Sequence, residues 1–238
     1  MQWRLSFPVQ VGMAFVVGFL GLVPVVIERA GATDRAAVAV EAESLVRSPI
    51  DDVVKVTNRT CDGGELIGTG TLLDDGRVLT AAHVVAGAEQ VTIAWEGSPS
   101  SVERVTGIAV AGGDDLAVLR LDGGPGVGIG RPVAAVDPAI GADPLTIAGH
   151  PDGGAEAVRL AHADHYLPGR DANDPPTLLR LDAESHPGDS GGPVLDRRGA
   201  VAAMVLSRET VTGLALTAPA SVLRAGIAGA VTVPIGSC

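Results

Sequence analysis

The feature that most constrains the fold is a pattern of short apolar runs broken by turn residues, which extends from residue 49 toward the end of the chain. Such runs are too short for most helices and are typical of β-strands. The 32 glycines and 16 prolines are scattered along the chain and favour many turns. The sequence therefore predicts an all-β domain over residues 49–238.

The apolar runs fall into two groups on either side of a glycine-rich connector, Gly123–Gly130. Asp74-Asp75-Gly76 predicts a hairpin turn in the first group, and Pro219–Ala228 predicts a short helix after the second. Two six-stranded β-barrels are expected, over about 49–122 and 131–228, although a single β-sandwich fits the same spacing. The expected strands are Ile50–Thr57, Leu66–Leu73, Arg77–Thr80, Gln90–Trp95, Val102–Val110, Leu116–Leu121, Pro132–Val136, Pro144–Ala148, Ala157–Ala161, Thr177–Leu181, Pro193–Leu195, Ala200–Ser207 and Gly213–Thr217.

An uncharged, mostly apolar run precedes this domain at residues 5–27, after Arg4. Its length is near the roughly 20 residues that a membrane helix needs, but Ala30-Gly31-Ala32 fits a signal-peptide cleavage site. Residues 1–32 are therefore predicted to be a signal peptide or a single membrane anchor, and the length favours the anchor. Either segment implies an exported domain, with residues 33–48 as a linker.

Charge and cysteine content exclude some classes of protein. The net charge of −11 disfavours nucleic acid and anionic membrane surfaces as partners. The two cysteines form no CxxC or Cys/His cluster, so neither a metal site nor a cofactor is expected. In an exported domain Cys61 and Cys238 are expected to form a disulfide, whereas two unpaired thiols are the alternative.

One stretch has the composition of a nucleophile loop: Gly188-Asp189-Ser190-Gly191-Gly192-Pro193. Its small residues let a substrate carbonyl approach the backbone. The amides of Gly188 and Ser190 are candidates for an oxyanion hole. Because a serine hydroxyl is a poor nucleophile alone, this hypothesis needs a histidine base and a carboxylate.

The chain offers candidates for both partners. His83 follows an expected strand and lies among small residues, which makes it the best candidate for the base. His186 is nearer in sequence, but only four residues along an extended loop separate it from Ser190. Asp115 opens an apolar strand and is the better candidate for a carboxylate that accepts the imidazole proton. Its neighbour Asp114 remains an alternative on physical grounds.

Three motifs in this order resemble the trypsin/chymotrypsin-like serine peptidases: Thr80-Ala81-Ala82-His83, Asp115-Leu116-Ala117 and Gly188–Pro193. The stretches Leu181–Pro193 and Gly213–Ser221 more closely resemble the bacterial HtrA/Deg branch. The resemblance covers roughly residues 49–228.

This resemblance implies a double β-barrel with the active site between the barrels. It implies a triad of His83, Asp115 and Ser190 that cleaves protein or peptide substrates through an acyl-enzyme. It also favours Asp115 over Asp114, because the acid of the family directly precedes the Leu-Ala strand. A non-catalytic protease-like binding or sensor protein is the alternative, and an esterase-like hydrolase is a third hypothesis.

The chain departs from the pattern in two places. HtrA-type proteins usually carry a PDZ domain after the protease, whereas here 17 residues follow Ser221, so none is expected. Asp189 stands where HtrA enzymes mostly have Asn. In digestive relatives this aspartate pairs with a newly cleaved N-terminus, but no matching start occurs near residues 45–55. The partner of Asp189 is left open, as is the oligomeric state.

The resemblance also suggests a substrate pocket. It puts Glu184 at the base, where a buried carboxylate would favour Arg or Lys in the substrate. The alternative is that Glu184 points away or pairs internally. Ser207 and Gly213 are expected in the pocket walls. Residues 163–176 are expected to form a surface loop beside the cleft.

Overall fold

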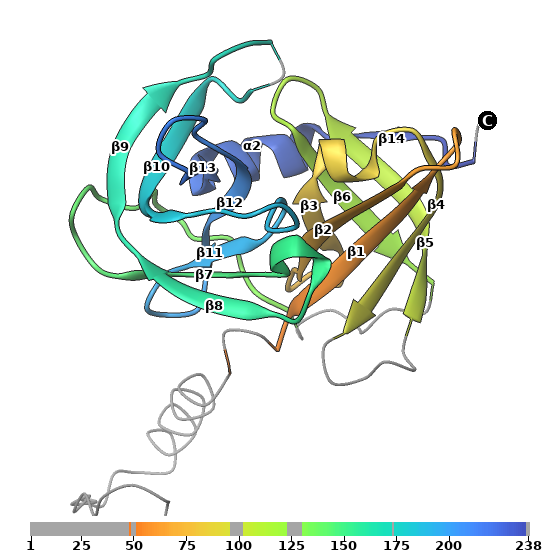
Figure 1. Cartoon of the computed structure of the whole chain (residues 1–238), viewed down its shortest axis with the longest axis horizontal. Coiled ribbons are helices and arrows are strands. Elements are labelled where there is room, and N and C mark those ends of the chain that lie inside the picture. Colours follow the sequence, from red (N-terminus) through yellow and green to blue (C-terminus); the bar gives the residue numbers. More distant parts are fainter. Residues whose placement is uncertain (1–47, 49–50, 96–101, 123–129, 173, 237–238) are drawn as a thin grey trace, which may run out of the picture. The chain divides into compact units, whose positions relative to one another are not determined.

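The computed structural model describes residues 48, 51–95, 102–122, 130–172 and 174–236 (Figure 1). The predicted signal peptide or anchor, residues 1–32, lies outside the described residues, as does the linker up to residue 47. In the described ranges, no helix is long and apolar enough to cross a membrane.

The first half of the domain forms a closed antiparallel barrel. Its strands pair in the order β5-β4-β1-β2-β3-β6, and β5 also pairs with β6, which closes the sheet. A seventh strand from the end of the described chain, β14, pairs with Ile108–Val110 of β5. The strands are β1 (Val53–Thr60), β2 (Glu65–Leu72), β3 (Val78–Ala81), β4 (Ala88–Trp95), β5 (Val102–Ala111), β6 (Leu116–Leu121) and β14 (Val231–Val233).

The second half forms a curled sheet in the order β8-β7-β11-β12-β13-β10-β9. Only His162 separates β8 from β9, so the two edge strands are joined directly through the chain. Covalent continuity thus brings the two edges together although they are not a hydrogen-bonded pair. The strands are β7 (Leu145–Gly149), β8 (Ala157–Ala161), β9 (Ala163–Pro168), β10 (Thr177–Glu184), β11 (Pro193–Leu195), β12 (Val201–Arg208) and β13 (Leu214–Pro219).

A single described α-helix, α2 (Ala220–Gly229), contacts both halves. It packs on β12 and β13 of the second sheet and on β5 and β6 of the first. Asp137 accepts hydrogen bonds from the backbone N–H and the hydroxyl of Ser221, which satisfies a free amide in the first turn. Two short 3₁₀ turns, η1 (Ala82–Val85) and η2 (Pro151–Gly153), lie beside the site described below.

Apolar side chains fill both halves, and one buried ion pair joins them. Arg131 and Asp52 form a bridge of 3.1 Å, and both side chains are almost fully buried. The Arg131 guanidinium also donates to the carbonyls of Gly199 and Ser48. This arginine therefore ties the start of the first barrel to the second sheet.

The expected trypsin-like, mostly β architecture with a short C-terminal helix is confirmed, and the pairing of β5 with β6 excludes a simple sandwich. Two local predictions are wrong. Pro132–Val136 forms only an isolated bridge between Val133 and Val201, because Pro132 cannot donate to a ladder. Residues 163–168 form β9 and not a loop.

Candidate active site

His83 is held by the turn that follows β3. The turn η1 starts directly after this strand, and His83 is its second residue. The buried side chain of Asn58 donates to the carbonyls of Val84 and Ala86, at 3.0 Å each, and so fixes the end of the turn. The imidazole itself is about half exposed, with 49% of its side-chain surface accessible. It is therefore fixed at its base and open on one side.

Asp115 meets His83 at two points. Its Oδ2 lies 2.7 Å from His83 Nδ1, and its Oδ1 accepts the backbone N–H of His83 at 2.9 Å. The carbonyl of Asp115 also accepts the N–H of Ala82. Asp115 has a left-handed φ of 44°, a conformation that Asp tolerates better than most residues. The structure thus brings Asp115, and not Asp114, to the histidine; burial raises the pKa of Asp114.

Ser190 opens into the same cleft as this His–Asp pair. The cleft has a volume of about 310 Å³ and is lined by His83, Asp115, Arg170, Asp174, Ser185, His186, Pro187, Ser190, Leu206, Ser207 and Arg208. The Ser190 hydroxyl donates to the carbonyl of Leu206 at 3.0 Å. Its own carbonyl accepts the N–H of Thr69 from the first barrel at 2.8 Å. Residues from both halves therefore hold the serine.

The loop before Ser190 is held by its carbonyl groups. The carbonyl of Pro187 accepts the N–H of Asp152, and that of Gly188 accepts the Thr69 hydroxyl at 2.7 Å. Because the peptide is trans, the Gly188 N–H points to the side opposite the Pro187 carbonyl. In the described part of the chain, no hydrogen bond occupies the N–H of Gly188 or of Ser190. Both amides are thus free to donate.

Asp189 is completely buried and has a partner that the sequence did not reveal. Its Oδ2 lies 2.7 Å from Arg159 Nη2 and accepts the N–H of His186 at 2.7 Å. Arg159 lies on β8, between the exposed side chains of Val158 and Leu160. The sequence left the partner of Asp189 open, and the structure shows that this partner is Arg159, a residue of the same domain.

The residues expected to form a substrate pocket are not all brought together. Ser207 lines the cleft, and its hydroxyl accepts a hydrogen bond from Arg170 at 3.0 Å. Glu184 is exposed at the end of β10 and does not line the cleft, and neither does Gly213. Arg170 also pairs with Asp174 at 2.7 Å, and this hydrogen bond holds the pKa of the aspartate below its usual value although burial opposes the shift.

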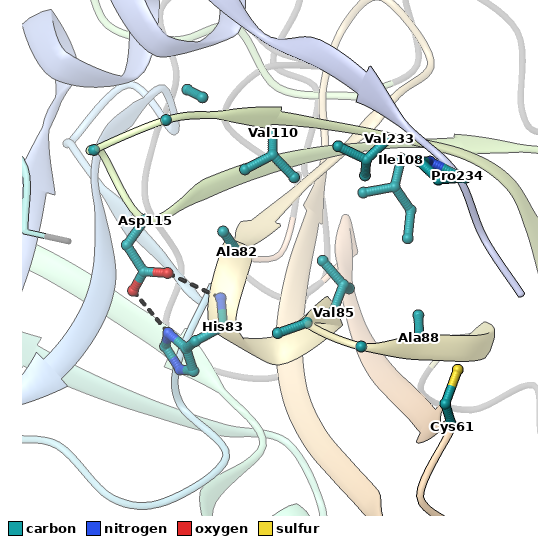
Figure 2. A pocket seen from close by; sticks show the side chains of 15 residues that line it. Cys61, Ala82, His83, Val85, Ala88, Ile108, Val110, Asp115, Val233 and Pro234 are labelled. Atoms are coloured by element: carbon teal, nitrogen blue, oxygen red, sulfur yellow. Dashed lines mark hydrogen bonds and ion pairs between the residues drawn. The ribbon is translucent and has the colours of Figure 1, made fainter. Parts of the chain in front are cut away.

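A second, mostly apolar hollow of about 610 Å³ begins at the His–Asp pair (Figure 2). Val85 and Ala88 lie on one side of it, and Ile108, Val110 and Val233 lie on another. Cys61 lies at the end away from His83.

The predicted disulfide and the metal-binding capacity of the chain are considered for the described residues. Cys238 lies outside the described residues, so its disulfide with Cys61 stays a prediction. Among the residues in the described ranges, no group of three His, Cys, Asp or Glu side chains is placed to hold a metal ion.

Two β-barrel halves with a serine and a His–Asp pair in a shared cleft define the double-barrel peptidase class. The family model described as a trypsin-like peptidase domain matches residues 68–204. The chain therefore belongs to the trypsin-like peptidase family, and it is homologous to HtrA/Deg-like serine proteases.

Individual relatives agree with this assignment. The serine protease Rv3671c of Mycobacterium tuberculosis is 31% identical over 214 residues, which are 82% of this chain and 52% of the relative. A probable periplasmic serine endoprotease, DegP-like, of Halomonas elongata is 29% identical over 145 residues, which are 57% of this chain and 28% of the relative. A crystal structure of the Rv3671c protease in an inactive form superposes with a TM-score of 0.65 at 26% identity, covering 80% of this chain and 94% of that one. The chain spans about half the length, or less, of these curated relatives.

Proposed function

We propose that this chain is an exported serine endopeptidase that hydrolyses peptide bonds through an acyl-enzyme. The observation that carries the proposal is the two-point contact between Asp115 and His83 in the cleft that Ser190 also lines. A carboxylate that binds both Nδ1 and the backbone of the histidine fixes the ring and its tautomer. With a proton on Nδ1, the imidazole leaves Nε2 as the base.

In the first step, Ser190 Oγ attacks the carbonyl carbon of the scissile peptide while His83 Nε2 takes its proton. The serine hydroxyl donates to the Leu206 carbonyl in the free structure. In the proposed mechanism, rotation about χ1 of Ser190 exchanges this hydrogen bond for one to His83. Asp115 stabilises the imidazolium that results, without itself taking up the proton.

The negative charge on the substrate oxygen is assigned to the amides of Gly188 and Ser190. Both N–H groups lack a protein acceptor among the described residues, and contacts to Asp152 and Thr69 orient the peptide before Gly188. Donors fixed in advance stabilise an oxyanion without reorganisation during the reaction. His83 then protonates the leaving amine, and a water molecule activated by the same imidazole hydrolyses the ester.

Protein or peptide segments are the proposed substrates, because the cleft is open and the apolar hollow begins beside His83. An apolar substrate side chain next to the scissile bond fits this hollow. The uncharged run at residues 5–27 supports an extracytoplasmic domain that is anchored, or secreted after cleavage. The periplasmic name of the Halomonas relative is consistent with this location.

The experiment is active-site labelling of the purified full chain with a fluorophosphonate, which reacts with an activated serine. Labelling is expected for the wild type and is lost in Ser190→Ala. His83→Ala is expected to slow the labelling by at least about 10³-fold, because the base is removed. Ser221→Ala is the control, since this serine lies on α2 outside the cleft, and its labelling stays at the wild-type level.

Two results would contradict the proposal. A folded wild-type protein that is not labelled would favour the non-catalytic binding or sensor protein. A labelled protein that cleaves nitrophenyl esters but neither casein nor a peptide library would favour the esterase-like hydrolase.

A further inference from the structure

We infer that the cleft at Ser190 takes an acidic side chain of the substrate, and that Arg208 is the residue that recognises its carboxylate. The inference rests on the proposed function, because it names the substrate class of that same cleft. It concerns peptides with Glu or Asp within about two residues of the bond that is cut. It reverses the basic preference that the sequence suggested from Glu184, a residue that does not line the cleft.

The first observation is the polarity of the cleft. Apart from Pro187 and Leu206, every residue that lines it has a charged or hydrogen-bonding side chain. Two of them are arginines, Arg170 and Arg208, although the chain as a whole carries a net charge of −11. An apolar substrate side chain would take water away from these groups without replacing its hydrogen bonds. The cleft therefore favours a polar side chain, in contrast to the apolar hollow beside His83.

The second observation is that both acids of the cleft are already engaged. Asp115 binds His83 at two points, as described above. The two carboxylate oxygens of Asp174 accept hydrogen bonds from Arg170 Nε and Nη2, at 2.7 and 3.0 Å. The same Nη2 also donates to the Ser207 hydroxyl at 3.0 Å. Arg170 is thus neutralised within the cleft, and neither acid is left for a second cation.

The third observation is that Arg208 has no counter-ion of its own. Its side chain is exposed at the end of β12, and among the described residues no acid pairs with it. The acid that follows it in sequence, Glu209, is held by the Thr212 hydroxyl at 2.5 Å and by Arg180 at 3.5 Å. Arg208 therefore brings an uncompensated positive charge to the cleft, and a substrate carboxylate would supply the missing partner.

The fourth observation is the place of Arg208 relative to the reacting serine. The Ser190 hydroxyl donates to the Leu206 carbonyl, and Arg208 follows two residues later on the same strand. Two residues of strand span roughly 7 Å. The pairing of β11 with β12 ends at Met204, so in the described ranges residues 206–208 have no strand on that side. An extended substrate along this stretch places a side chain beside Arg208.

The test compares peptides that differ at one position and are cleaved by the full chain. A mixed peptide library first locates the bonds that are cut. Glu, Gln and Lys are then placed in turn at the positions within two residues of one such bond. Because Glu and Gln have nearly the same shape, the ratio of their kcat/KM values isolates the charge. At the best position this ratio is expected to be about 10 to 100, and the Lys peptide is expected to be cleaved more slowly than the Gln peptide.

Substitutions at Arg208 assign the preference to this side chain. Arg208→Gln is expected to lower the Glu-to-Gln ratio to less than about threefold, because the charge is removed. Arg208→Lys keeps a charge and is expected to retain the ratio within about threefold of the wild type. Arg208→Glu is expected to favour the Lys peptide over the Glu peptide. Arg197→Gln is the matched control with a wild-type ratio, because Arg197 is exposed but pairs with Asp143 outside the cleft.

Binding to Ser190→Ala gives a readout that does not depend on turnover. Fluorescence anisotropy is expected to show tighter binding of the Glu peptide than of the Gln peptide in this variant. Adding Arg208→Gln is expected to make the two affinities equal within about threefold. The preference of Ser190→Ala is also expected to shrink between about 0.05 and 1 M NaCl, since salt screens an exposed ion pair.

Equal kcat/KM values for the Glu and Gln peptides at every position, or a preference for Lys, would overturn the inference and leave the proposed function in place. A Glu preference that persists unchanged in Arg208→Gln would refute the role of this arginine. If the folded wild type cleaves no peptide, the proposed function fails, and binding to Ser190→Ala decides the inference. Tighter binding of the Glu peptide that depends on Arg208 would support it, and equal binding of the two peptides would refute it.

Discussion

Thr69 offers the sharpest test of how the two halves hold the serine loop. Its side chain is fully buried on β2, and its hydroxyl makes two hydrogen bonds. It donates to the Gly188 carbonyl at 2.7 Å and accepts the N–H of His150 at 2.9 Å. Thr69→Val keeps the shape of the side chain but removes both hydrogen bonds.

The expected cost follows from these two groups. A buried polar group that loses its partner costs about 1–3 kcal/mol. Because the Gly188 carbonyl is only partly buried and water can reach it, about 2–4 kcal/mol is expected for Thr69→Val. For a domain of this size that corresponds to a fall in Tm of about 5–15 °C. Fluorophosphonate labelling is expected to slow as well, since Gly188 loses its anchor.

The same strand supplies a matched control. Thr71 is also fully buried, but within the described residues its hydroxyl has no hydrogen-bond partner. Thr71→Val removes an unsatisfied polar atom and is expected to leave stability unchanged or to raise it by up to about 1 kcal/mol. Urea denaturation and labelling of both variants measure the difference. An equal loss of stability in the two variants would refute the hydrogen-bond explanation.

Two further predictions concern the loops around the serine. Gly191→Ala is expected to prevent folding or lower Tm by more than about 10 °C, because φ is +86° and a Cβ would lie 2.1 Å from the Thr69 carbonyl oxygen. Gly63→Ala is the control, since Gly63 has a similar φ but open space around it. This variant is expected to lose only about 1 kcal/mol of unfolding free energy in urea denaturation. Arg170 lowers the pKa of Asp174 relative to the unfolded chain, so the pair stabilises the fold above about pH 4 and is lost as pH falls through the lower folded pKa. The Tm difference between the wild type and Asp174→Asn should therefore shrink below about pH 4, and a constant difference from about pH 3 to 7 would contradict this.

Where apolar residues alternate with turns, the strands could be predicted from the sequence. Leu116–Leu121 and Ala157–Ala161 have the expected bounds, and the motifs around His83, Asp115 and Ser190 meet in one cleft. The strand β9 was missed because only its first residue, Ala163, is buried. A strand with an exposed face carries little apolar periodicity, so its pairing with β10 leaves no local signal.

Arg159 was missed for the opposite reason. The sequence Ala157–Ala161 does alternate, but the usual assumption turns Val158 and Leu160 inward and leaves the arginine in solvent. In the structure Val158 and Leu160 face outward and Arg159 faces inward, because Arg159 pairs with the buried carboxylate of Asp189, 30 residues away. Only the unexplained aspartate before Ser190 hinted that such a partner existed. Glu184 is a second example of a side-chain direction that the sequence did not determine, since its position in the motif predicted a place in the pocket and it is exposed outside the cleft.

The strand β14 has a consequence for how the protein is made. It adds a seventh strand to the sheet of the first barrel by pairing with Ile108–Val110, yet it is synthesised after the whole second sheet and α2. During translation the edge of β5 at Ile108–Val110 that pairs with β14 therefore emerges from the ribosome long before its native partner exists. An unpaired edge can recruit another strand. Nascent chains stalled between residues 122 and 230 should consequently be the species that aggregate or need a chaperone, even though every strand of the closed barrel has already been made.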